Sequence, residues 1–244
     1  YWRWREGIGP RAGRRPMVNY LWGGVETNHI GIEEVLGLCA TVGADPIVGI
    51  NFAADGRPEY IRTHLGEDRA GTAEEAADLV RYCNDPDHPE RRANGRAAPW
   101  GVRLWQIGNE TSYPKAGHRF TSEQNWREYR HFAAAMRAAD AGAQLIGWGD
   151  QERDTDRWWA TDLLREAGEH VDLVALHMMH QKPDRPDTLL QGRRYRRDYH
   201  AAWGELMEMY GKVERKLTEA REVVRAGDPA MRVAITEGHL SLRP

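Results

Sequence analysis

Two glutamates, Glu110 and Glu237, occupy positions in the sequence where a carboxylate can do chemistry. Each one ends a short apolar segment, GVRLWQIGNE for Glu110 and RVAITE for Glu237. A carboxylate at the end of a buried strand has no core partner, so it meets solvent, a cation or a substrate. For a single glutamate, a structural role beside an arginine or a helix N-terminus explains the position equally well. Two such glutamates that converge on one pocket predict acid and base catalysis.

The segments that must position these glutamates alternate between strand and helix patterns. Apolar runs predict five strands, at residues 44–51, 101–110, 144–148, 171–179 and 232–237. Helical spacing predicts helices over 32–42, after capping boxes at 72–75 and 121–124, around 158–164, and over 203–224 before Gly227-Asp228-Pro229. Alternation of this kind indicates a parallel sheet that is covered by helices.

Two α/β architectures fit this alternation, an open doubly wound sheet and a closed (β/α)₈ TIM barrel. No predicted strand is followed by the glycine-rich turn of a dinucleotide-binding fold, and the glycines within residues 7–13 have the wrong spacing. Barrel enzymes build their sites from polar residues at the carboxyl ends of the strands. Each predicted strand has such a residue: Asn51, Asn109 and Glu110, Asp150, His177, and Glu237. We therefore expect a TIM barrel, of which about strands three to seven are present.

The spacing of the two glutamates around such a barrel predicts a reaction class. They end strands that are three steps apart, so their side chains would meet across the mouth. Two carboxyl groups about 5–5.5 Å apart are typical of a retaining glycoside hydrolase, in which one is the nucleophile and the other the acid and then the base. The acid needs a raised pKa, which a second ionised carboxylate nearby supplies.

Composition narrows the classes of partner. The 244 residues carry 34 basic and 37 acidic side chains, a net charge of −3, which gives no general attraction to nucleic acid or to a membrane surface. No apolar run reaches the roughly 20 residues that a membrane-spanning helix needs. Two cysteines exclude a disulfide framework and favour a reducing compartment such as the cytoplasm. The expected partner is an oligosaccharide or polysaccharide, and homo-oligomer formation stays open. The ten tryptophans suit stacking on sugars, although core packing better explains any single one.

Residues 104–110, LWQIGNE, resemble the fourth strand of a large clan of barrel glycosidases, in which an Asn-Glu pair carries the acid/base. Other segments narrow the resemblance to the α-L-arabinofuranosidases of glycoside hydrolase family 51. These are residues 1–11, similar to the stretch after that family's second strand; 26–34, similar to its next helix entry; 81–84, 92–95 and Pro99, similar to the run into the acid/base strand; 175–177, similar to the sixth strand; and 235–237, similar to the nucleophile strand.

The resemblance implies roles for individual residues. Glu110 would be the acid/base and Glu237 the nucleophile, and Asn109 would hydrogen-bond the sugar hydroxyl beside the anomeric carbon. His177 would order the surroundings of the nucleophile. The implied activity is that of a retaining, exo-acting α-L-arabinofuranosidase, with no cofactor and no metal.

The sequence departs from the family at places that bear on the substrate. Met179 stands where the family has a tyrosine near the nucleophile, Ser-Tyr-Pro at 112–114 replaces its usual loop, and Gly-His at 238–239 is unusual. By the resemblance, Asn51 and Trp22 would lie near the substrate. Two alternatives therefore stay open: a β-glycosidase or endoglucanase of the same clan, and a carbohydrate-binding barrel without catalysis.

The resemblance also implies a domain organisation. Residues 1–244 would form the central part of a catalytic barrel, with the first two strands, the eighth strand and any β-sandwich domain outside it. Five of eight strands cannot close a barrel, so we expect the isolated polypeptide to be inactive.

Four other features suggest chemistry less strongly. His177 and His180 could ligate a metal, but residues three apart on a strand point to opposite faces and no acid or cysteine clusters beside them. Cys83 has no adjacent base, which favours a core thiol over a nucleophile. The arginine-rich run at 193–197 is typical of a solvated loop, and the segment 178–199 is long enough for a lid.

Overall fold

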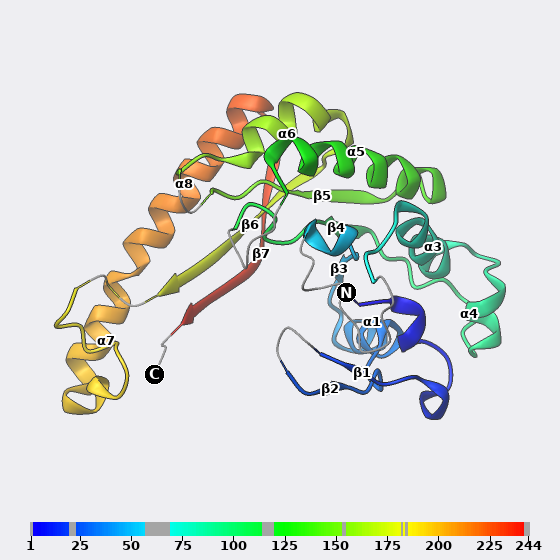
Figure 1. Ribbon diagram of the computed structural model, residues 1–244, viewed down its shortest axis with the longest axis horizontal. Helices are drawn as coiled ribbons and strands as arrows, with labels where there is room; N and C mark the ends of the chain where they lie inside the picture. Colours follow the sequence, from blue (N-terminus) through cyan, green and yellow to red (C-terminus); the bar gives the residue numbers. More distant parts are fainter. Residues whose placement is uncertain are drawn as a thin grey trace.

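The computed structural model describes residues 2–19, 23–56, 69–113, 120–152, 155–181, 183 and 185–241. Its central element is a five-stranded parallel sheet in which each strand pairs with the next one in sequence. The strands are β3 (Ile47–Gly49), β4 (Leu104–Ile107), β5 (Gln144–Trp148), β6 (Leu173–Gln181) and β7 (Arg232–Ser241). The sheet curls, and helices line its outer side (Figure 1). This is an incomplete barrel wall, and the predicted α/β class and strand sequence are confirmed.

Helix α1 (Ile32–Val42) precedes β3, and the other helices lie between successive strands of the sheet. These are α3 (Ala73–Asn84), α4 (Pro89–Ala93), α5 (Ser122–Ala139), α6 (Trp159–Ala167), α7 (Tyr199–Glu208) and α8 (Tyr210–Gly227). A small antiparallel pair, β1 (Met17–Val18) and β2 (Val25–Glu26), precedes them. Short 3₁₀ turns lie at η1 (Trp4–Gly7), η2 (Arg11–Gly13), η3 (Ala53–Gly56), η4 (Gly168–His170) and η5 (Arg194–Arg197).

Side-chain caps start two of the helices where the sequence predicts them. The Thr72 hydroxyl accepts the N–H of Glu75 at 3.2 Å. Thr121 and Gln124 form a reciprocal capping box, with bonds of 3.1 and 2.9 Å. The single helix predicted over 203–224 was wrong, because α7 and α8 are separate. Between them the Met209 N–H bonds the Leu206 carbonyl, three residues back, which tightens one turn.

The predicted bounds of α1 and β5 are confirmed, whereas several other strand bounds were wrong. The strand predicted over 101–110 is only β4, because Gly101 and Gly108 on either side adopt left-handed backbone conformations with φ of +71° and +88°. β6 and β7 run further than predicted because they pair with each other as far as Gln181 and Ser241. The segment proposed as a lid therefore begins as strand.

The main core lies between the sheet and the helices α3, α5 and α6. Large side chains such as Leu79, Tyr129, Phe132, Met136 and Leu163 fill it. Cys83 is fully buried there, and burial raises the pKa of its thiol to about 12. The prediction of an inert core thiol is confirmed.

A second, smaller cluster lies on the inner face of the sheet, toward the barrel mouth. Trp148, Trp159, Tyr113, Ile146 and Ala175 form its centre. Three tryptophans, Trp105, Trp148 and Trp159, are fully buried, so for them core packing explains the residue type.

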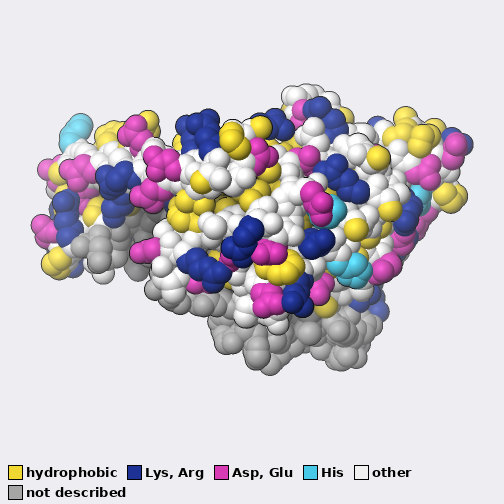
Figure 2. All heavy atoms as spheres, turned by 90° about the horizontal axis from the view of Figure 1, so that it is seen from above, with side chains coloured by type: hydrophobic (Ala, Val, Ile, Leu, Met, Phe, Trp, Pro, Cys, Tyr) yellow, Lys and Arg dark blue, Asp and Glu magenta, His cyan; other side chains and the backbone are white. Residues whose placement is uncertain are grey.

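The described surface carries charges of both signs. On the face seen in Figure 2, basic and acidic side chains are intermingled rather than gathered into one patch, in keeping with the near balance of 34 basic and 37 acidic residues. Within the described ranges, no helix combines the length and apolar character that crossing a membrane requires.

Candidate active site

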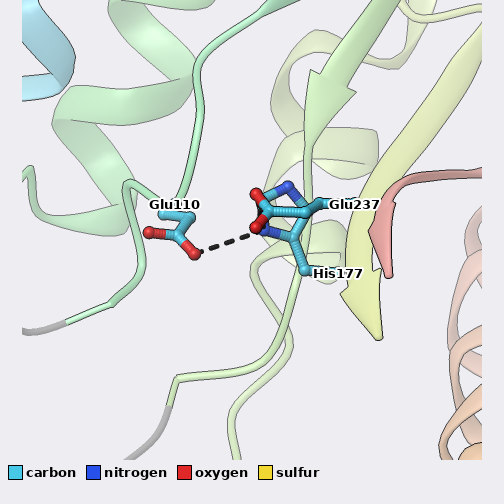
Figure 3. A group of neighbouring side chains, drawn as sticks. All are labelled: Glu110, His177 and Glu237. Atoms are coloured by element: carbon cyan, nitrogen blue, oxygen red, sulfur yellow. Dashed lines mark hydrogen bonds and ion pairs between the residues drawn. The ribbon is translucent and has the colours of Figure 1, made fainter. Parts of the chain in front are cut away.

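Three side chains converge on the inner face of the sheet: Glu110, His177 and Glu237 (Figure 3). They come from the turn after β4, from β6 and from β7. The Nδ1 atom of His177 lies 3.3 Å from Glu110 Oε1 and 3.5 Å from Glu237 Oε2. The nearest ligand atoms of all three lie within 4.8 Å of one another. The structure therefore brings together the two glutamates and the histidine that the sequence singled out.

Glu110 is held by a strained turn directly after β4. Gly108 has a φ of +88° and Glu110 itself has a φ of +53°, a left-handed conformation that costs a non-glycine residue about 1 kcal/mol or more. The Tyr113 N–H bonds the Glu110 carbonyl at 3.0 Å and closes the turn. The Glu110 side chain is buried, with a relative exposure of 6%. This backbone aims the carboxylate into the barrel mouth rather than along the strand.

A β-bulge turns Glu237 toward the same mouth. Leu176 pairs with Ile235, but the next pair is His177 with Glu237, so Thr236 is the extra residue. Ile235 lies on the α8 side of the sheet, together with Val233 and Leu217. Because side chains alternate along a strand, a regular β7 would also turn Glu237 toward α8. The bulge reverses that direction, and the carboxylate is 45% exposed on the inner face.

His177 lies between the two carboxylates with its ring packed against aromatic side chains. Its side chain is 1% exposed. The ring centroid of Trp148 lies 4.6 Å from that of His177, with the two rings nearly perpendicular, and the ring centroid of Tyr113 lies 6.5 Å from it. These contacts fix the imidazole plane, so that one nitrogen faces both glutamates.

The other predicted substrate residues lie outside this trio. Asn109 is exposed beside Glu110, and its side-chain oxygen accepts a 3.4 Å bond from Gln106. The Asn51 amide is engaged with the backbone: it donates to the carbonyls of Trp2 and Arg69 and accepts from the Ala54 N–H. In this structure Asn51 holds the loop after β3. Trp22 lies outside the described residues.

The trio is also an arrangement of donors that could hold a cation, within the part of the chain that the structure describes. An imidazole and two carboxylates are acceptable ligands for zinc. The pairing suggested by the sequence, His177 with His180, is not visible, because the His180 side chain lies outside the described atoms.

Sequence reasoning missed a group of residues directly behind His177. The strand-end pattern predicts the position of Asp150 but no role for it, and it does not point to Lys216. Both hydrogen-bond the main chain of His177. One sequence pattern indicates a role for Lys216: it lies between Val213 and Ala220 on the apolar face of α8. A lysine on such a face needs a charged or polar partner.

Comparison with known proteins places this chain in a family. A family model described as an alpha-L-arabinofuranosidase 1 domain matches residues 1–200. An intracellular exo-alpha-L-arabinofuranosidase of Bacteroides ovatus is 32% identical over 181 residues, which are 72% of this chain and 32% of that protein. An exo-alpha-(1->6)-L-arabinofuranosidase of Bifidobacterium longum is 29% identical over 194 residues, which are 76% of this chain and 34% of that protein.

Solved structures share the fold over nearly the whole chain. The alpha-L-arabinofuranosidase of Thermotoga maritima, in an arabinose complex, superposes with a TM-score of 0.75 at 23% identity, covering 100% of this chain and 44% of that one. The GH51 arabinofuranosidase of Xanthomonas axonopodis pv. citri gives a TM-score of 0.76 at 23% identity, covering 98% and 45%. In sequence, the chain spans about a third of the length of the Bifidobacterium longum and Bacteroides ovatus relatives. Since the family model covers residues 1–200 of its 244 residues, the chain belongs to the alpha-L-arabinofuranosidase family.

Proposed function

We propose that the protein carrying this chain is a retaining, exo-acting α-L-arabinofuranosidase, with Glu110 as acid/base and Glu237 as nucleophile. The observation that carries this proposal is the approach of the two carboxylates, whose nearest oxygens lie within 4.8 Å. Inverting enzymes separate these groups by about 6.5–9.5 Å to admit a water, whereas retaining enzymes hold them about 5–5.5 Å apart. The spacing supports double displacement.

The two glutamates differ in burial. The Glu110 side chain is 6% exposed beside His177, and the Glu237 side chain is 45% exposed on the inner face, where a sugar can reach it. Glu237 attacks the anomeric carbon while Glu110 protonates the departing oxygen. Glu110 then takes a proton from water, the water oxygen bonds the anomeric carbon, and Glu237 leaves.

His177 and Asn109 support this chemistry in the proposal. A histidine between two carboxylates can donate a hydrogen bond that moderates their repulsion. Asn109, exposed next to Glu110, is available to the hydroxyl beside the anomeric carbon.

The names of the relatives support arabinofuranose as the sugar and exo-acting cleavage. The Bacteroides ovatus and Bifidobacterium longum proteins are both named exo-acting arabinofuranosidases. Several relatives, including those of Streptomyces lividans and Bacillus subtilis, are also named intracellular, so we propose an intracellular location. The linkage is not carried over, because those names differ between (1->6) and (1->5).

The test uses the complete gene product with Glu110→Ala, Glu237→Ala, and Glu219→Gln as an exposed control on α8. On an aryl α-L-arabinofuranoside we expect Glu237→Ala to lose about 10³-fold or more in kcat, because it cannot form the covalent intermediate. Added azide should give the arabinosyl azide of inverted configuration with Glu237→Ala and of retained configuration with Glu110→Ala. The opposite pattern, or full activity in either variant, would contradict the assignment.

A substrate panel separates the alternatives. The inner face next to His177 carries Met179, packed against the Tyr113–Trp148 cluster, where the family has a tyrosine. Aryl arabinofuranoside, xyloside, galactofuranoside and glucoside should be compared, and we expect the arabinofuranoside to give the highest kcat/KM. A preference for a pyranoside would favour a β-glycosidase. Sugar binding that survives both alanine variants, with no turnover by the parent, would favour a carbohydrate-binding barrel.

A further inference from the structure

A buried charge lies directly behind the trio, at the end of β5. The Asp150 side chain is 0% exposed. Its oxygens accept the His177 N–H at 3.1 Å, the Gln151 N–H at 2.7 Å and the hydroxyl of Tyr113. An ionised carboxylate at such depth is tolerated only when it is paired and fully hydrogen-bonded.

The countercharge comes from a helix that is distant in sequence. Lys216 of α8 reaches Asp150 with its Nζ at 2.9 Å and also donates to the His177 carbonyl at 2.7 Å. Its neighbours on the same face of α8, Val213 and Ala220, pack against β6. The lysine stem thus runs through an apolar layer before its ammonium meets Asp150.

These two side chains continue the sheet beyond the point where its strands stop pairing. The register between β5 and β6 ends at Trp148 and Ala175, two residues before His177. Past that point, Asp150 accepts from the N–H of His177 and Lys216 donates to its carbonyl. Both main-chain groups of the histidine are therefore held by one ion pair, while its imidazole lies between Glu110 and Glu237.

The same ion pair links all three chain segments that carry the trio. Asp150 binds Tyr113, whose N–H closes the turn of Glu110. Lys216 lies on α8, the helix that leads into β7 and Glu237. A shift of this pair would move the turn, the strand and the helix together.

We propose that Asp150 and Lys216 are positioning residues that set the place of the His177 imidazole, and through it the spacing of the two catalytic carboxylates. The expected effect on the reaction rate rests on the proposed function, whereas the expected effect on the position of His177 does not. Both residues lie behind His177 and bond its main chain, so neither is assigned a contact with the sugar. The expected effect is therefore on kcat, because misplacement of about 1 Å in a reacting group can cost about 10²-fold in rate.

The experiment uses the complete gene product with Lys216→Met, Asp150→Asn and the double variant. Lys216→Met leaves Asp150 as an uncompensated buried charge and should lower the melting temperature, whereas the double variant removes both charges and should recover most of it. On an aryl arabinofuranoside we expect kcat to fall about 10–100-fold in all three, with KM changed less than about threefold. Lys212→Met, exposed on the same helix, is the control and should match the parent.

Two measurements keep this inference separable from the proposed function. If the parent hydrolyses no glycoside, the proposed function fails, and a crystal structure of the double variant still decides the positioning role. Displacement of the His177 Nδ1 by more than about 0.5 Å relative to either glutamate would support it. An unchanged trio, or a folded double variant with parental kcat, would overturn it. If Lys216→Met does not fold, the double variant carries the test.

Discussion

At the level of single residues, His177 is the side chain that joins the two carboxylates. One nitrogen lies 3.3 Å from Glu110 and 3.5 Å from Glu237, and it can donate to only one of them at a time. A hydrogen bond from this nitrogen can offset the repulsion between two carboxylates in close approach.

Replacing His177 by phenylalanine tests this role. The change keeps a ring against Trp148 and removes the nitrogen, so we expect the protein to fold and kcat on an aryl arabinofuranoside to fall about 10²-fold. His200→Phe, at an exposed position on α7, should leave kcat unchanged. A parental rate in His177→Phe would show that the histidine has no part in the chemistry.

At the level of elements, an ion pair fastens the N-terminal segment to α1. Arg14 and Glu34 form two 2.9 Å hydrogen bonds, and Arg14 also donates to the Gly9 and Asn28 carbonyls. Glu34 further accepts the Gly31 N–H at the start of α1. Chiefly because of Arg14, the pKa of Glu34 is lowered from 4.5 to about 2.

This pKa predicts how stability depends on pH. Because the folded-state pKa lies below the ordinary value, the stabilisation is complete above about pH 4.5 and is lost as the pH falls toward 2. Glu34→Gln should therefore lower the free energy of unfolding at pH 7 by on the order of 2–3 kcal/mol, and by much less at pH 2–3. Urea unfolding of the complete gene product across this range measures it, with exposed Glu222→Gln of α8 as control. An equal loss for Glu34→Gln at every pH would contradict the linkage.

At the level of the whole molecule, the sheet has two edges. In the described part of the chain, β3 and β7 each pair on one side only. Apolar side chains are exposed at both ends, with Ile47 of β3 at 45% and Ile235 of β7 at 48%. An edge strand leaves a row of backbone N–H and C=O groups without sheet partners, and a closed barrel has no such edges.

The open edges predict the behaviour of residues 1–244 expressed alone. We expect this polypeptide to show no turnover of an aryl arabinofuranoside and to self-associate through its exposed strands. The assay compares it with the complete gene product, and light scattering follows its association. Turnover by a monodisperse preparation of residues 1–244 would show that five strands suffice for a working site.

The sequence by itself determined the order of strands and helices, because apolar periodicity is a local property of the chain. It also predicted that Glu110, His177 and Glu237 meet at the carboxyl-end side of the sheet, which the structure shows, although His177 and Glu237 lie within β6 and β7 rather than at their ends. Local chemistry likewise started α5 at its capping box.

Only the tertiary structure decided which way Glu237 points and what holds His177. Period-two alternation alone would turn Glu237 toward α8, and the bulge at Thr236 arises from pairing with β6. The bonds of Asp150 and Lys216 to His177 join residues 27 and 39 positions apart, and the bond between Asp150 and Lys216 joins residues 66 positions apart. Such contacts depend on how the strands and helices pack, and local patterns carry no information about that packing.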